Sequence, residues 1–149
     1  MKQLAVKFRR LAHAGDLALP SYATSGAAGL DLAAAINRPI CLKPNMRQAI
    51  PTGFAMALPA GYEAQIRPRS GLALKYGITV SNSPGTIDSD YRGEIAVILA
   101  NNGTDNFTIT HGMRIAQMVI AAVTIMAPVE ADELDDTARA TGGFGSSGL

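Results

Sequence analysis

The sequence NSPGTIDSDYRGE, residues 82–94, lies between two strand-like segments, ITVS at 78–81 and IAVILA at 95–100. Its glycines and proline are typical of a hairpin connection. A structural turn does not need aspartate, tyrosine and arginine so close together. A carboxylate in a rigid hairpin, such as Asp88, can take a proton from water, and the ring of Tyr91 can contact a flat substrate. A solvated turn is the alternative interpretation, because aspartate and glycine are common turn residues.

Short apolar segments separated by turn residues continue on both sides of this hairpin. One of them, YEAQIR, alternates so that Ala64 and Ile66 point inward. One segment differs: PRSGLALKYG, residues 68–77, predicts a short helix with Ser70 as its N-cap and Gly77 after its last turn. Strands are expected at 4–8, 28–35, 40–42, 47–51, 53–58, 62–67, 107–110 and 111–125. The pattern predicts an all-β sandwich, jelly roll or barrel with one short helix.

The composition indicates one globular domain. The chain has 149 residues, 48% of them hydrophobic and 17% charged, and a net charge of +1, which is not typical of a protein that binds duplex nucleic acid. The longest apolar run, 118–129, is too short to span a membrane and is expected to be a buried strand. The N-terminus lacks the apolar core of a signal peptide. With a single cysteine, Cys41, and two histidines, a disulfide within the chain and a Cys/His zinc site are excluded, and a reducing cytoplasm is expected.

Three polar positions stand out from their surroundings. Asp31 interrupts the apolar segment AGLDLAAA, and Gln117 interrupts the run 111–125, where it needs a hydrogen-bond partner such as a backbone carbonyl. Arg69 lies at the start of the expected helix, where free N–H groups suit phosphate oxygens. Each position also has a plainer explanation: a solvated strand end, a satisfied core amide or an incidental arginine.

The C-terminal part changes character at residue 130. EADELDD, residues 130–136, holds five carboxylates, and the glycine-rich TARATGGFGSSGL follows, so we expect a tail that is flexible until a partner or ligand orders it. GFGSSG matches G-x-G-x-x-G, but no strand precedes it and no helix can follow it, so a dinucleotide fold is rejected. A serine triad is not indicated either, since His13 and His111 lie in unremarkable contexts. The tail could wrap phosphates while Phe144 stacks on a base.

Together these segments resemble the trimeric deoxyuridine triphosphate nucleotidohydrolases (dUTPases). Five motifs occur in the family's order: AGLDLAA at 28–34, PRSGLA at 68–73, NSPGTIDSDYRGE at 82–94, GMRIAQMV at 112–119 and RATGGFGSSG at 139–148. The chain departs from the family at Ala140, where the family has glycine. If that position requires a positive φ, alanine costs about 1 kcal/mol there and could slow closure of the arm.

The resemblance implies a jelly-roll-like β subunit that forms a homotrimer with three sites at the subunit contacts. It implies a catalytic domain over 1–129 and a mobile arm over 130–149 that closes on bound nucleotide. The implied reaction is hydrolysis of dUTP to dUMP and pyrophosphate, which keeps uracil out of DNA and supplies dUMP for thymidylate synthesis. Neither nucleic acid nor a membrane is an expected partner.

Residue by residue, the resemblance implies the following roles. Asp88 is the general base that activates water, Tyr91 packs against the deoxyribose, and Asp31 helps to place Mg²⁺ through water. The uracil edge is read by Asn82 and by the backbone of Gly85, Thr86 and Ile87. The phosphates are bound by Arg69, Ser70, Gly71 and Gln117. The arm contributes Arg139, Phe144, Gly145, Ser146 and Ser147.

Two alternatives remain on sequence grounds. A dCTP-deaminase-like enzyme would share the fold but release ammonia; the YRGE hairpin and the glycine-rich arm favour the triphosphatase. A nucleotide-sensing trimer without activity is the second alternative, and the intact Asp88 and arm argue against sensing as the only role.

Overall fold

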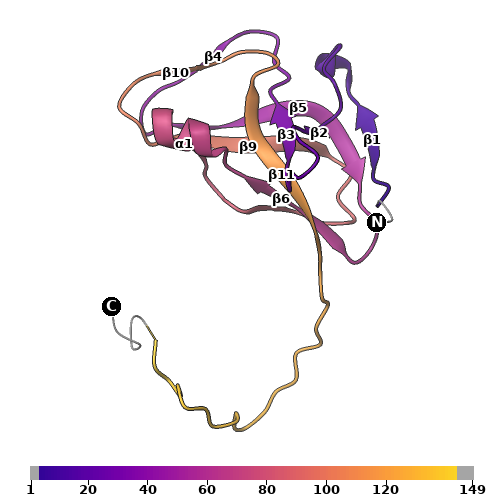
Figure 1. The fold of residues 1–149 in the computed structure, drawn as a ribbon, viewed down its shortest axis with the longest axis vertical. Helices are drawn as coiled ribbons and strands as arrows, with labels where there is room; N and C mark the ends of the chain where they lie inside the picture. Colours follow the sequence, from indigo (N-terminus) through magenta and orange to yellow (C-terminus); the bar gives the residue numbers. More distant parts are fainter. Residues whose placement is uncertain (1–3, 144–149) are drawn as a thin grey trace.

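The structure is a computed structural model that describes residues 4–143. It is built almost entirely from strands, as expected for an all-β protein, with a 3₁₀ turn η1 (Ala12–Ala14) and one short helix, α1 (Ser70–Tyr76) (Figure 1). The strands are β1 (Lys7–Arg10), β2 (Ser21–Tyr22), β3 (Leu30–Ala33), β4 (Ile40–Leu42), β5 (Arg47–Ala57), β6 (Tyr62–Arg67), β7 (Ile78–Val80), β8 (Gly85–Ile87), β9 (Glu94–Asn101), β10 (Phe107–Ile109) and β11 (Arg114–Ala122).

Two main sheets enclose the core. One has the strand order β1-β5-β9-β7 and the other β2-β3-β11-β6-β8, with β10 and β4 forming a separate pair. Ile50 and Val97 are paired across β5 and β9, and both are fully buried, as are Leu32 and Met118 on β3 and β11. The strand alternation explains this burial, because every second side chain of a strand points to the same face. A jelly-roll-like sandwich is therefore confirmed.

The connection at 82–94 is more than a hairpin turn. β7 and β9 pair antiparallel, as predicted, but β8 within the connection leaves their sheet and pairs with β6 in the other sheet. Gly85 permits this crossing, because a Cβ there would lie 3.1 Å from Asn82 Nδ2 and 3.4 Å from Ile66 Cβ. The connection thus joins both sheets at one edge of the sandwich.

β5 is one long strand rather than the two short ones that were predicted. It runs from Arg47 to Ala57 through a bulge, at which its register against β9 shifts between Pro51 and Ala55. Gly53 takes φ +76° inside the bulge, and Thr52 Oγ1 donates to Ile95 O at 2.7 Å. Gly53, which was expected to begin a second strand, is therefore the residue that lets one strand bend and continue.

The predicted helix is present, but its start differs. Ser70 is the first helical residue and Arg69 is the N-cap, without a side-chain capping bond, so the prediction that Ser70 is the N-cap was wrong. Its hydroxyl stands one residue too late to reach back to the free N–H groups. Gly77 ends the helix in the left-handed conformation at φ 68°, as predicted.

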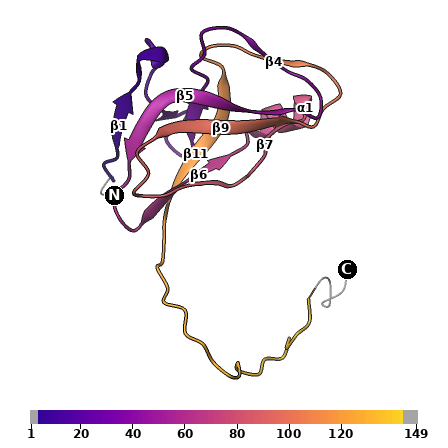
Figure 2. The same cartoon turned by 180° about the vertical axis from the view of Figure 1, so that it is seen from behind.

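The apolar run 118–129 is only partly a buried strand. β11 ends at Ala122, opposite the first residue of β6, Tyr62. Beyond it Ile125 and Val129 are 84% and 86% exposed, so the predicted burial was wrong there. The chain runs away from the sandwich in both views (Figures 1 and 2), because the described part of the chain offers it no partner strand. No helix within residues 4–143 is long and apolar enough to cross a membrane.

Candidate active site

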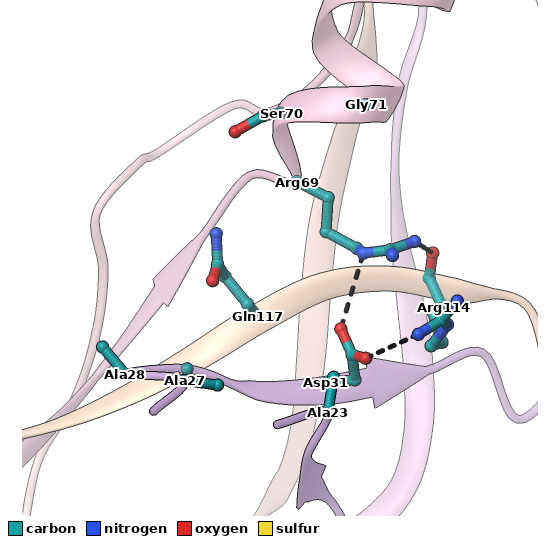
Figure 3. A pocket seen from close by; sticks show the side chains of 10 residues that line it. Ala23, Ala27, Ala28, Asp31, Arg69, Ser70, Gly71, Arg114 and Gln117 are labelled. Carbon is teal, nitrogen blue, oxygen red and sulfur yellow. Dashed lines mark hydrogen bonds and ion pairs between the residues drawn. The ribbon is translucent and has the colours of Figure 1, made fainter. Parts of the chain in front are cut away.

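A pocket of about 340 Å³, here called the α1 pocket, opens between the start of α1 and strands β3 and β11 (Figure 3). It brings together three sequence motifs that are far apart in the chain. Its lining consists of Ala23, Ala27, Ala28, Gly29, Asp31, Arg69, Ser70, Gly71, Arg114 and Gln117. All the predicted phosphate-binding residues of the body and the predicted metal-positioning residue therefore lie in one place.

Strand register places two of these side chains side by side. Asp31 on β3 is paired with Gln117 on β11. Gln117 Nε2 donates to Pro68 O at 2.9 Å, which confirms the expected backbone partner and ties β11 to the loop before α1. A Cβ at Gly29 would lie 2.6 Å from Gln117 Oε1, so a larger residue there would require this amide to shift.

Asp31 is held by two arginines. Its Oδ2 accepts from Arg114 Nη1 at 2.9 Å, and its Oδ1 lies 3.5 Å from Arg69 Nε. Arg69 Nη1 also donates to Arg114 O at 3.0 Å, so its side chain crosses the pocket from the start of α1 to β11, as Figure 3 shows. The three side chains form one network rather than independent charges.

Arg114 is a site residue that the sequence reasoning missed. It lies within the quoted motif GMRIAQMV, three residues before Gln117. An arginine so close to the other polar residue of an apolar strand was the available signal. The register of β11 against β3 shifts between Arg114 and Ala116, and this irregularity lies beside the ion pair with Asp31.

The charge of the α1 pocket favours an anionic ligand. Arg69 and Arg114 face one carboxylate, so the network carries a net positive charge. Their side chains are 29% and 57% exposed, so solvent screens the network and its arginine N–H groups are accessible to a ligand. Arginine forks match the geometry of phosphate oxygens.

The residues that line the α1 pocket are compatible with a hydrated Mg²⁺, but not with an Mg²⁺ held by protein ligands alone. Among residues 4–143 there is no cluster of three or more histidine, cysteine or acidic side chains that could hold a metal. Asp31 contributes the only carboxylate to the lining of the α1 pocket, and both of its oxygens already have arginine neighbours. Mg²⁺ bound to phosphates keeps several waters and needs only one or two carboxylates. Asp31 thus fits a hydrated Mg²⁺ that arrives with phosphates, contacted through water.

A second pocket of about 300 Å³, the hairpin pocket, lies beside Asp88 and shares no lining residue with the α1 pocket. It lies where the hairpin meets the outer face of β5 and β9. Its lining consists of Ala49, Thr86, Ile87, Asp88, Tyr91, Glu94, Ile95, Ala96 and Ile98. Within one chain, the predicted base and the predicted phosphate-binding residues are therefore in separate pockets.

The hairpin tip is held by hydrogen bonds within itself. Tyr91 N donates to Asp88 O at 3.2 Å, and Arg92 Nη1 donates to Ser89 O at 2.6 Å. Tyr91 Oη donates to Glu94 O at 3.1 Å. Asp88 is exposed, so its carboxylate is open to water and to a ligand.

The predicted base-reading residues lie along β8 and the turn before it. Gly85, Thr86 and Ile87 form β8, and Asn82 packs over the face of Gly85 that lacks a side chain. Asn82 itself is exposed and lines neither of the two pockets.

The described part of the arm contacts neither pocket. Arg139 Nε donates to Gly142 O at 2.9 Å within a local turn, and Ala140 has φ 44°. The segment lies apart from the sandwich in Figures 1 and 2. The remaining predicted arm residues lie outside the described residues; they are Phe144, Gly145, Ser146 and Ser147.

The convergence of three motifs in the α1 pocket agrees with comparison to known proteins. The family model described as dUTPase matches residues 16–148. The chain belongs to the dUTPase family. It is 59% identical over 142 residues to the deoxyuridine 5′-triphosphate nucleotidohydrolase of Sinorhizobium medicae, covering 94% of this chain and 89% of that protein. It is 56% identical over 148 residues to the protein of the same name from Caulobacter vibrioides, with 98% and 96% covered.

Solved dUTPases share the fold. The structure matches a mutant dUTPase of Staphylococcus bacteriophage 80alpha with dUpNHpp at a TM-score of 0.87 and 22% identity, covering 97% of this chain and 99% of that one. It matches a mutant dUTPase from phage phi11 of S. aureus, described with a structural Mg(II) ion, at a TM-score of 0.78 and 21% identity, covering 87% and 97%. The fold of the dUTPase family is therefore present almost over the whole chain.

Proposed function

We propose that this dUTPase-family enzyme, a dUTP diphosphatase, hydrolyses dUTP to dUMP and pyrophosphate through water activated by Asp88. The observation that carries the proposal is the α1 pocket, in which Asp31, Arg69, Arg114 and Gln117 from three distant segments surround one cationic hollow. A triphosphate is the ligand that such a hollow suits, because its arginines can neutralise several phosphate oxygens at once.

The α1 pocket would position the phosphates. Arg69 and Arg114 offer N–H groups, while Ser70, Gly71 and Gln117 line the pocket beside them. Asp31 would hold Mg²⁺ through water, and Mg²⁺ neutralises charge on the phosphates when it is bound. Phosphoryl transfer needs such positioning and neutralisation more than covalent chemistry.

The hairpin would supply the base and read the nucleoside. The exposed carboxylate of Asp88 would take a proton from the water that attacks the α-phosphate. Asn82 and the backbone of β8 would hydrogen-bond the uracil edge. The ring of Tyr91 would lie against the deoxyribose and exclude a 2′-hydroxyl. The chemistry requires a carboxylate near the phosphate, which the separate pockets of one chain do not provide.

A homotrimer with sites at subunit contacts would bring the two pockets together. The outward residues of β5 and β9 beside Asp88 are apolar, namely Ala49, Ala96 and Ile98. Apolar side chains on an outer sheet face favour coverage by another subunit. The exposed apolar segment 123–129 is a second surface that assembly could bury. The arm at 130–149 would then extend from the domain at 1–129 and close over bound nucleotide with Arg139 and the residues that follow.

The proposed role is to keep uracil out of DNA and to supply dUMP for thymidylate synthesis. Neither nucleic acid nor a membrane enters this proposal as a partner, because the net charge is only +1. A cytoplasmic location is part of it, since dUTP belongs to the pool of DNA precursors.

The test is release of pyrophosphate from dUTP, dTTP, dCTP and UTP, each with and without Mg²⁺. Fast release from dUTP alone, dependent on Mg²⁺, supports the proposal. Release from several nucleotides would contradict the assigned recognition residues. Ammonia release from dCTP would instead identify the deaminase reaction, and binding of dUTP without hydrolysis would identify a nucleotide sensor.

A further inference from the structure

The base of the catalytic hairpin is anchored by one carboxylate that the proposed chemistry does not use. Glu94 Oε1 lies 2.6 Å from His13 Nε2 and accepts from Gly53 N at 2.7 Å. The histidine nitrogen must be the donor, because an ionised carboxylate only accepts. Two segments far apart in the sequence therefore meet on a single oxygen, six residues beyond Asp88.

The bulge of β5 creates this meeting point. Gly53 points its N–H at Glu94 from the bulge, and its O accepts from Leu11 N at 2.9 Å. The buried Ala14 of η1 fills the space beside Gly53, where a Cβ would lie 2.5 Å from Ala14 Cβ. This close packing brings His13, the residue before Ala14, to the carboxylate. The contact is thus fixed by packing on both sides.

The same glutamate positions Tyr91. Tyr91 Oη donates to the backbone O of Glu94, and the ring lies so close to Gly93 that any Cβ there would collide with the hydroxyl. Apart from these contacts the ring is largely open, with 47% of Tyr91 exposed. Asp88, Tyr91 and Glu94 line one pocket. The placement of the tyrosine therefore depends on where the backbone of Glu94 is held.

We infer that His13 is a positioning residue for sugar selection: through Glu94 it fixes Tyr91, and with it the preference for dUTP over UTP. The inference rests on the proposed role of Tyr91. The route runs from His13 Nε2 to the Glu94 carboxylate, and from the Glu94 carbonyl to Tyr91 Oη. Without the hydrogen bond from His13, the side chain of Glu94 is held only by Gly53 N. Glu94 can then move, and its backbone O, which accepts from Tyr91 Oη, moves with it.

The alternative explanation is that the contact between His13 and Glu94 stabilises the fold and has no effect on function. The side chains of His13 and Glu94 are 34% and 27% exposed, so solvent screens the pair and its contribution to global stability is small. A sub-ångström shift of Tyr91, in contrast, changes the clearance around a 2′-hydroxyl directly. Selectivity is therefore the property that separates the two explanations.

The experiment compares His13→Gln with His13→Asn in the full chain. Both are neutral amides, but only glutamine carries its N–H to the position of Nε2. We expect His13→Asn to lower the ratio of kcat/KM for dUTP to kcat/KM for UTP about fivefold, the upper end of what a partly exposed ion pair contributes. We expect His13→Gln to retain most of the ratio, and both variants to melt near the wild-type temperature.

Arg10→Ala is the matched control. Arg10 Nη1 donates to Gly15 O and Leu17 O, so this variant loosens the same N-terminal segment without touching Glu94. Its nucleotide ratio should stay at the wild-type value. His13→Leu, which removes the donor and leaves the bond from Gly53 N to Glu94 Oε1 in place, should lower the ratio even if His13→Asn folds poorly.

Three results would overturn the inference: an unchanged ratio in His13→Asn and His13→Leu, equal losses for the glutamine and asparagine variants, or the same loss in Arg10→Ala. Failure of the proposed function looks different, because wild-type protein would then show no preference for dUTP over UTP. The wild-type ratio is therefore measured first.

Discussion

The α1 pocket and the hairpin pocket are built in different ways. Asp31, Arg69 and Gln117 come from three distant segments and are locked together by an ion-pair network and a bond to Pro68 O. The hairpin tip around Asp88 and Tyr91 is exposed and is held mainly by hydrogen bonds to its immediate neighbours in the chain. One region is organised by the tertiary fold, and the other by local turns with one long-range anchor.

This difference suits two different tasks, binding of charged phosphates in the α1 pocket and proton transfer in the hairpin pocket. Groups that stabilise charge act best when they are fixed before the substrate arrives, as in the α1 pocket. A base that must reach water and the substrate can stand on a less covered segment, where few buried contacts resist local motion. Changes in the two pockets should therefore affect different kinetic parameters.

The largest effect is expected in the hairpin pocket. Asp88→Asn should reduce kcat about 10²–10⁴-fold, because a general base contributes on that scale, while affinity for dUpNHpp stays within about tenfold of wild type. Pyrophosphate release and calorimetric binding measure the two quantities. Asp90→Asn, two residues away in the same hairpin, is the control and should stay near wild type. Near-normal turnover of Asp88→Asn would remove the residue from its role.

Substitutions in the α1 pocket should weaken the binding of dUTP. Asp31→Asn releases Arg69 and Arg114 from their carboxylate, and we expect KM for dUTP with Mg²⁺ to rise about tenfold, on the scale of a charged hydrogen bond. The free energy of unfolding should change by only about 0–1 kcal/mol, because the pair is partly exposed. Steady-state kinetics and chemical denaturation check both. An effect confined to kcat would contradict the assignment of this pocket to binding.

Gly93→Ala tests the local part of the hairpin. The added Cβ would collide with the hydroxyl of Tyr91 and displace the ring, so the preference for dUTP over UTP should fall about fivefold, roughly the loss of a neutral hydrogen bond. Comparing kcat/KM for the two nucleotides measures it. Gly26→Ala is the control, since nothing lies within 4 Å of a Cβ there. An unchanged preference would show that the ring adapts, and that its position does not select the sugar.

The smallest effect concerns the arm. Ala140 has φ 44°, a conformation that suits the family's glycine better than alanine, so Ala140→Gly should relieve about 1 kcal/mol of strain. If closure requires this conformation while the free arm also adopts others, kcat/KM should rise by up to about fivefold. Ala138→Gly adds the same backbone freedom without relieving strain at residue 140, and should not raise activity. Equal behaviour of the two variants would contradict a role for the strain.

Local features of the fold were predictable where one residue type has one physical use. Gly77 ends the helix because its left-handed φ suits glycine, and Ala64 and Ile66 are buried because a strand alternates. The need of Gln117 for a backbone carbonyl followed from its apolar run. The errors lie where contacts with distant residues decide the outcome. Ser70 was placed one position from its actual role, and two strands, 47–51 and 53–58, were expected where β5 is one strand with a bulge.

The candidate site divides in the same manner. Sequence motifs led to Asp31, Arg69, Gln117 and Asp88, because each of these polar residues lies in one of the five motifs. Arg114 and His13 were missed, since their significance lies in partners 83 and 81 residues away in the chain.

The sequence by itself determined the strand alternation, the short helix, the five motifs and hence the family. Only the tertiary structure decided that β8 crosses to the other sheet, that three motifs share the α1 pocket while Asp88 stands in another, and that His13 meets Glu94. The physical reason is the sequence separation over which each effect acts. Periodicity and φ preferences depend only on residues a few positions apart in the chain. Sheet register and bulges bring distant residues together through the packing of the whole core.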